Sequence, residues 1–181
     1  SGALFAAFTG DEKVRTRTVE LIDSVLKSRD ETGYIGMFKP EPGATQNGRN
    51  WVLHEQEYLI LGLTDFYRFC GDTNALVAAR TLADYVLEQF PKNKTPERIC
   101  TAGLPEAMLV LYGVTGDKRY LDFAADTPHG NKSGEIKFAS VRTWRQTFEQ
   151  KPAHVYVMLA RCYAQMRLFR VTGEKNLQEM S

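Results

Sequence analysis

The chain has 181 residues, of which 43% are hydrophobic, and its 23 basic and 22 acidic residues leave a net charge of +1. This length allows one domain with a sizeable core, and the near balance of charge argues against nucleic acid or an anionic membrane as a partner. No apolar run is long enough to span a bilayer, so we expect a soluble protein of the cytoplasm, the periplasm or the exterior.

The three cysteines, Cys70, Cys100 and Cys162, are far apart in the sequence and form no CxxC pair. That spacing predicts neither a disulfide framework nor a zinc site. Free thiols packed as small apolar groups are the simpler interpretation. We therefore expect no cofactor within this chain.

The first helix is predicted at about residues 11–28, where apolar side chains recur at helical spacing. Residues 29–50 hold four glycines and two prolines, so they are predicted to form a loop, and a loop of that length usually has a function. Helices are then predicted at residues 51–70, 73–90, about 102–114, 118–125 and 152–171. Residues 126–147 are predicted to be irregular, with a weak strand pattern at 135–141.

A last helix is predicted to begin at Glu174 and to reach the final residue without a stop signal. The fold class is therefore all-α, and we expect residues 1–181 to be a partial domain. Apolar stripes would then face water where neighbouring helices are missing.

Four short stretches, at residues 8–11, 69–72, 114–117 and 171–174, each contain a glycine followed by an acidic residue. Glycine can end a helix because it accepts left-handed backbone without a steric penalty, and the acidic residue can cap the next helix. Each stretch thus predicts a tight turn between two antiparallel helices. The glycines expected to have positive φ are Gly10, Gly71, Gly116 and Gly173. Their uneven spacing favours helix pairs with variable loops over a strict solenoid.

Polar residues collect at the starts of the predicted helices that follow the irregular stretches. In a ring of helix pairs, alternate helices point the same way, so these starts would line one pocket. We expect His54, Glu106 and His154 to converge there from three helices. Glu55 would join them or support His54 from behind, and nearby aromatic rings would stack on a sugar. The candidate substrate-binding residues are Trp51, His54, Glu55, Tyr58, Glu106 and His154.

Each of these residues also has a plainer interpretation. A histidine at a helix start is often a cap or a surface group, and acidic residues in a first turn are favoured by the helix dipole alone. Tryptophans often anchor a core. Only their clustering on one side of the predicted ring supports a binding face.

Several segments together resemble glycoside hydrolase family 127, the β-L-arabinofuranosidase-like proteins. They are DETGYIGMF at 30–38, WVLHE at 51–55, GLPE at 103–106, TGD at 115–117, and Glu149-Gln150 with His154. The resemblance implies antiparallel helix hairpins that form part of an (α/α)6 barrel, with a carbohydrate substrate and the remainder of the barrel as partners.

The same resemblance implies that a catalytic Glu, a thiolate nucleophile and the zinc that activates it belong to the full-length parent. None of the three cysteines here matches the family's ligands, so the chain would contribute a sugar-binding face and the catalytic residues are unknown. Two other functions stay open. One is another α/α-barrel carbohydrate enzyme, of the unsaturated glucuronyl hydrolase or sugar epimerase type, in which His54 and His154 act as acid and base. The other is a non-catalytic helical-repeat module that binds a protein.

Overall fold

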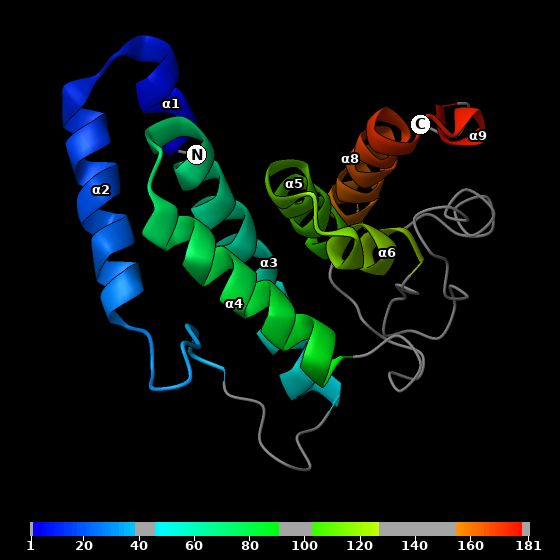
Figure 1. The fold of residues 1–181 in the computed structure, drawn as a ribbon, viewed down its shortest axis with the longest axis horizontal. Coiled ribbons are helices and arrows are strands. Elements are labelled where there is room, and N and C mark those ends of the chain that lie inside the picture. Colours follow the sequence, from blue (N-terminus) through cyan, green and yellow to red (C-terminus); the bar gives the residue numbers. More distant parts are fainter. Residues whose placement is uncertain (1, 39–45, 91–102, 127–154, 179–181) are drawn as a thin grey trace.

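The structure is a computed structural model of the chain, and it describes residues 2–38, 46–90, 103–126 and 155–178. Within those ranges the secondary structure is entirely helical, which confirms the predicted all-α class (Figure 1). The helices are α1 (Gly2–Thr9), α2 (Glu12–Lys27), α3 (Gln46–Cys70), α4 (Thr73–Gln89), α5 (Leu104–Thr115), α6 (Lys118–Asp126), α8 (Val155–Thr172) and α9 (Lys175–Gln178).

Four left-handed glycines reverse the chain between paired helices, as the sequence predicts. Gly10, Gly71, Gly116 and Gly173 have φ of 71°, 76°, 69° and 73°. The N–H of each donates to the carbonyl four residues earlier, at 2.7–2.9 Å, which closes the last turn of the preceding helix. The helix pairs are therefore α1/α2, α3/α4, α5/α6 and α8/α9.

The residues on either side of these glycines complete the turns. Asp11 and Asp72 accept hydrogen bonds from two backbone N–H groups each at the starts of α2 and α4. Thr115 donates its hydroxyl to the Leu111 carbonyl and accepts from the backbone N–H of Asp117. The turn sequence thus satisfies backbone groups on both sides of the reversal.

The helices form two layers. Helices α1, α3, α5 and α8 pack side by side in that order, and α4 lies against α3 in front of it in Figure 1. Glu57, in the first half of α3, contacts Gly103 at the start of α5, whereas the ends of α3, α5 and α8 line one hollow. Because earlier residues meet earlier residues and ends meet ends, α3, α5 and α8 run in the same direction. We call α1, α3, α5 and α8 the inner layer.

The core lies between the layers. Six small or aliphatic residues of α4 are almost fully buried, and α4 packs on α3: Ala75, Ala78, Ala79, Leu82, Ala83 and Val86. The short side chains let the two helix backbones approach closely. Helix α4 is also hydrogen-bonded to α6, because the Tyr120 hydroxyl of α6 donates to the Asp84 carboxylate of α4 at 2.9 Å.

Two helices differ from the sequence prediction. Helix α1 was not predicted as a separate element, although Gly10 was expected to end a helix. Helix α3 begins at Gln46 rather than at Trp51, so part of the predicted loop 29–50 is helical. Gly48, in this part of the 25-residue helix, costs roughly 1 kcal/mol of stability relative to alanine. The packing of α3 against α4 and α5 can offset this cost. The strand pattern at 135–141 lies outside the described residues.

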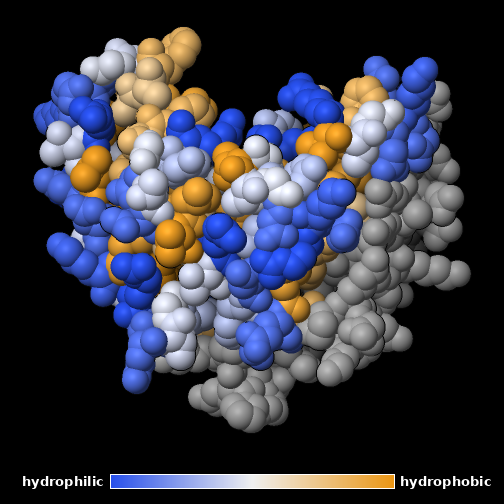
Figure 2. Space-filling view, viewed as in Figure 1, coloured by the Kyte–Doolittle hydropathy of each residue, from blue (hydrophilic) through white to orange (hydrophobic). Residues whose placement is uncertain are grey.

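Large apolar side chains are exposed at both ends of the inner layer. On α1, Phe8 is 89% exposed, and on α8 Val155 and Leu159 are 66% and 64% exposed. Figure 2 shows an apolar area, in orange, over the turn between α1 and α2 at the upper left. The expectation of apolar stripes left uncovered by missing helices named no surface, and it stays a prediction.

We expect Gly71→Ala to destabilise the protein by about 1–2 kcal/mol, because an L-residue resists left-handed backbone. A Cβ at Gly71 would meet nothing within 4 Å, so the cost is one of backbone conformation alone. Chemical denaturation followed by circular dichroism measures it.

The matched control is Gly62→Ala in the middle of α3, where a Cβ also meets nothing within 4 Å. Its backbone is helical, so alanine should stabilise the protein by roughly 0.5–1 kcal/mol. If the free energy of unfolding changes in the same direction in both variants, Gly71 does not owe its place to left-handed backbone.

Candidate functional site

The segment before α3 is a tight turn held by Asp30. One carboxylate oxygen of Asp30 accepts from the backbone N–H groups of Thr32 and Tyr34 and from the Thr32 hydroxyl, at 2.6–3.1 Å. Gly33 supplies the positive φ, 83°, that the turn needs. Tyr34 then points inward, where its ring packs 4.9 Å from that of Tyr85 and its hydroxyl donates to the Phe38 carbonyl. Burial raises the pKa of Tyr34, which keeps this phenol protonated as a donor.

Two consecutive residues of α3 hold the rest of this segment. The Glu55 carboxylate accepts from the backbone N–H of Met37 at 2.9 and 3.0 Å and from that of Phe38 at 3.4 Å. The buried Gln56 side chain donates to the Ile35 carbonyl at 3.0 Å. A Cβ at Gly36 would lie 2.5 Å from a Glu55 oxygen, so only glycine permits this approach. Glu55 therefore anchors the loop to the start of α3.

An aromatic surface lies on the start of α3. The His54 ring meets the rings of Trp51 and Tyr58 edge-on, at centroid distances of 5.8 and 5.1 Å. Trp51 in turn stacks against Phe38, 6.2 Å away. Trp51 and Tyr58 are each about half exposed, at 52% and 54%. We call Phe38, Trp51, His54 and Tyr58 the aromatic platform.

A buried carboxylate lies beneath the platform. Glu57 is 2% exposed, and one of its oxygens is 3.2 Å from Nδ1 of His54. Its other oxygen accepts from the backbone N–H of Gly103 at 3.1 Å, at the start of α5. From sequence alone Glu57 is an acidic residue near a helix start. Its role depends on Gly103 being its neighbour, which no local pattern reveals.

A second polar group lies further along α5. Glu106 forms an ion pair with Arg167 of α8 at 3.4 Å, and the Arg167 guanidinium lies over the Tyr163 ring, 4.9 Å from its centroid. Burial raises the pKa of Glu106, Arg167 opposes this rise, and Asp65 of α3 adds to it. Glu106 lines an open groove of about 620 Å³ whose other lining residues are Val155, Leu159, Ala160 and Tyr163.

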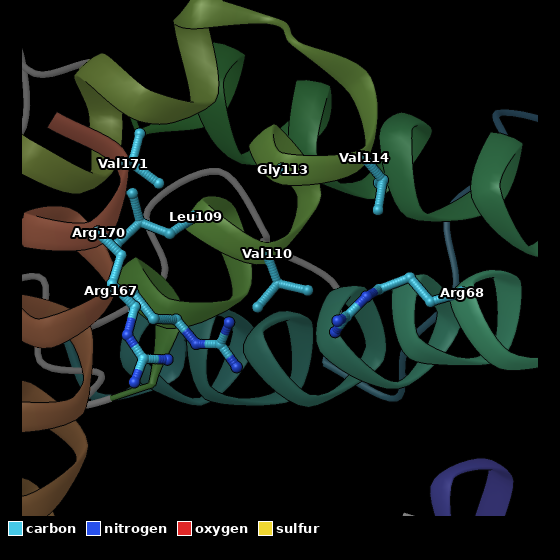
Figure 3. Close-up of a pocket in the computed structure, with 8 residues that line it drawn as sticks. All are labelled: Arg68, Leu109, Val110, Gly113, Val114, Arg167, Arg170 and Val171. Atoms are coloured by element: carbon cyan, nitrogen blue, oxygen red, sulfur yellow. The ribbon is translucent and has the colours of Figure 1, made fainter. Parts of the chain in front are cut away.

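A smaller hollow of about 170 Å³ lies between the ends of α3, α5 and α8. Arg167 and Arg170 reach into it from α8 and Arg68 from α3, over Val110 and Gly113 of α5 (Figure 3). Arg68 pairs with Asp65 at 3.0 Å. Asp65 and Arg68 thus form an ion pair within α3, whereas the pair of Glu106 and Arg167 joins α5 to α8.

The structure therefore places the sequence-predicted residues in two groups. Trp51, His54 and Tyr58 come together on the platform, whereas Glu106 faces the groove beside α8. Glu55 binds the backbone N–H groups of Met37 and Phe38 in the loop, and the carboxylate that contacts His54 is that of Glu57 instead. His154 lies outside the described residues, so its convergence with His54 and Glu106 stays a prediction.

One model of a known protein family matches this sequence. The sequence model described as "Beta-L-arabinofuranosidase, GH127 catalytic domain" matches residues 1–181.

The chain belongs to this family of glycoside hydrolases.

The match confirms the resemblance drawn from the loop, the WVLHE segment and the glycine turns. An all-helical chain is consistent with a piece of the family's helical barrel, and a glycoside hydrolase family implies a carbohydrate substrate. Comparisons with curated proteins and with solved structures returned no match.

Zinc, which the resemblance implies for the parent protein, has no ligand set in the described part of the chain. No group of three or more His, Cys, Asp or Glu side chains there could hold a metal ion. Cys70 is exposed and Cys162 half-buried, and both are free thiols. We derive no step through a metal from these residues. None of the described helices combines the length and apolarity needed to cross a membrane.

We expect the raised pKa of Glu106 to make stability depend on pH. The folded state holds this proton more tightly than the unfolded state, so the free energy of unfolding falls as pH rises from the ordinary value of 4.5 through the folded pKa. Glu106→Gln should remove that fall, so the stability of wild type relative to the variant should decrease over this window. Chemical denaturation from about pH 4 to pH 7 measures the difference.

Arg167→Gln provides the opposite test. It removes the charge that lowers the pKa of Glu106, so the fall in stability should extend to higher pH. If wild type and Glu106→Gln show parallel pH profiles, the assigned burial of Glu106 is wrong.

Proposed function

We propose that this chain forms the sugar-binding side of a hydrolase that acts on an L-arabinofuranoside. The observation that carries the proposal is the aromatic platform, because it combines exposed rings with a histidine whose position is fixed from below. Membership of the family supplies the reaction class and the type of sugar.

The chemistry of the platform suits a neutral sugar. Exposed Trp51 and Tyr58 offer apolar ring faces against the C–H groups of a sugar. The imidazole of His54, between them, can exchange hydrogen bonds with sugar hydroxyls. A few well-placed polar groups among aromatic rings are typical of small-molecule sites.

Glu106 and the groove beside α8 would form a further part of the same binding face. Both groups lie toward the starts of parallel helices of the inner layer. In the proposal, His154 joins them from the region before α8. Glu55 acts indirectly, since it holds the loop that carries Phe38 beside Trp51.

The proposal also includes further helices of the barrel as the chain's partners. They would cover the exposed apolar side chains on α1 and α8, which are the two end helices of the inner layer. The residues named here bind and orient the substrate, and bond cleavage is not assigned to any of them.

In the full-length protein, we expect His54→Ala to lower kcat/KM for an arabinofuranoside about fivefold. This corresponds to the loss of one hydrogen bond, on the order of 1 kcal/mol, with more lost if the sugar hydroxyl stays unpaired. Trp51→Ala should act in the same direction because it removes the stacking surface. Thermal melts should show a smaller effect on stability than on turnover.

Phe8→Ala is the matched control. Phe8 is an exposed aromatic residue of the inner layer, but it lies at the end of α1 rather than at a helix start. Because the proposed partner helices would cover Phe8, this variant can lose stability, but kcat/KM of the folded protein should stay unchanged. Normal turnover by both His54→Ala and Trp51→Ala would refute the platform as a sugar site.

A further inference from the structure

We infer that Glu57 is a positioning residue that fixes the tautomer of His54. It holds the imidazole with its proton on Nδ1, so that Nε2 is left as a hydrogen-bond acceptor. The 3.2 Å contact between the two side chains, the burial of Glu57 and the hydrogen bond that it accepts from Gly103 all support this role.

The contact itself decides where the proton lies. Nδ1 of His54 is 3.2 Å from Oε1 of Glu57, and the two residues are three apart on α3, where side chains meet on one face. A carboxylate has only acceptors, so a neutral imidazole is attracted to it only by donating an N–H. That donor is Nδ1–H, and the remaining ring nitrogen, Nε2, then carries a lone pair.

The Glu57 carboxylate cannot turn away from the imidazole without losing the hydrogen bond that it accepts from the backbone N–H of Gly103. Its Oε2 accepts from the backbone N–H of Gly103 at 3.1 Å, and the side chain is 2% exposed. A Cβ at Gly103 would lie 3.1–3.2 Å from the carboxylate, so a side chain there would require the carboxylate to shift by a few tenths of an ångström. The start of α5 therefore sets the orientation of Glu57.

The ring of His54 is also held in place from both sides. Trp51 and Tyr58 contact it at interplanar angles of 73° and 80°. A half-turn of the imidazole would put a carbon in the place of Nδ1 and lose the contact with Glu57. The side chain is 36% exposed, which leaves part of the ring open to a ligand.

The consequence for recognition rests on the proposed function. If a sugar binds on the platform, Nε2 accepts a hydrogen bond, and the partner must be a hydroxyl that donates. Glu57 would thus specify the direction of this hydrogen bond without touching the ligand. It also couples the platform on α3 to the start of α5, three residues before Glu106.

Nitrogen NMR of the full-length protein labelled with ¹⁵N-histidine tests the inference without any ligand. At about pH 9, where ordinary imidazoles are neutral, two-bond ¹⁵N–¹H correlations distinguish the protonated ring nitrogen from the bare one. The signal of His54 is assigned by its loss in His54→Gln. We expect a protonated Nδ1 and a bare Nε2 in wild type.

Glu57→Gln should reverse this pattern. The glutamine oxygen can still accept from the Gly103 N–H, but its NH2 group now faces Nδ1 and donates to it. The proton should therefore move to Nε2. Glu55→Gln is the matched control, because Glu55 is also on α3 but binds the loop backbone, and it should leave the tautomer unchanged.

A wild-type spectrum with the proton on Nε2 would overturn the inference, and it would show that the buried acid donates a proton to Nδ1. An unchanged tautomer in Glu57→Gln would overturn it equally. If that variant does not fold, the wild-type spectrum alone decides. Because no sugar is present, failure here is distinct from failure of the proposed function, which the turnover of His54→Ala tests.

Discussion

The reversal of the chain at a left-handed glycine is the constraint on which the rest of this structure depends. Each reversal takes only two residues between helices, so the second helix of a pair must return along the first. Alternate helices then run in the same direction, and their starts gather at one end of the inner layer. This is how Glu57 of α3 comes to contact Gly103, although the two are 46 residues apart.

The start of α3 shows how one helical segment can serve a core, a loop and a surface at once. Neighbouring residues on a helix point about 100° apart. Gln56 and Glu57 accordingly face inward, Glu55 faces the loop, and His54 faces the surface. Burying Gln56 and Glu57 would be costly without partners, and the Ile35 carbonyl and the Gly103 N–H provide them.

The sequence predicted those parts of the fold that depend on short-range chemistry. A glycine followed by an acidic residue encodes its own turn, so Gly10, Gly71, Gly116 and Gly173 could be assigned without the fold. The start of α3 at Gln46 could not, because loop-forming residues there become helical only within a long, well-packed helix. The partnership of Glu57 with Gly103 was equally hidden, because it depends on which helices are neighbours. His54, Trp51 and Tyr58 were recoverable because their spacing alone places them near one another.

Two ion pairs in the molecule accompany opposite shifts in the pKa of their carboxyl groups. Asp117 lies 2.6 Å from the Arg119 guanidinium at the exposed turn after α5, and this hydrogen bond lowers the pKa of Asp117. Glu106 also has an arginine partner, but its burial outweighs the effect of Arg167 and raises its pKa. The first carboxyl favours its charged form, as suits a helix cap. The pKa of the second is shifted toward the neutral form, although its carboxylate still pairs with Arg167. A neutral ligand such as a sugar is better matched by this environment than a charged one, since the nearby Arg68 and Arg167 are already paired with acidic side chains.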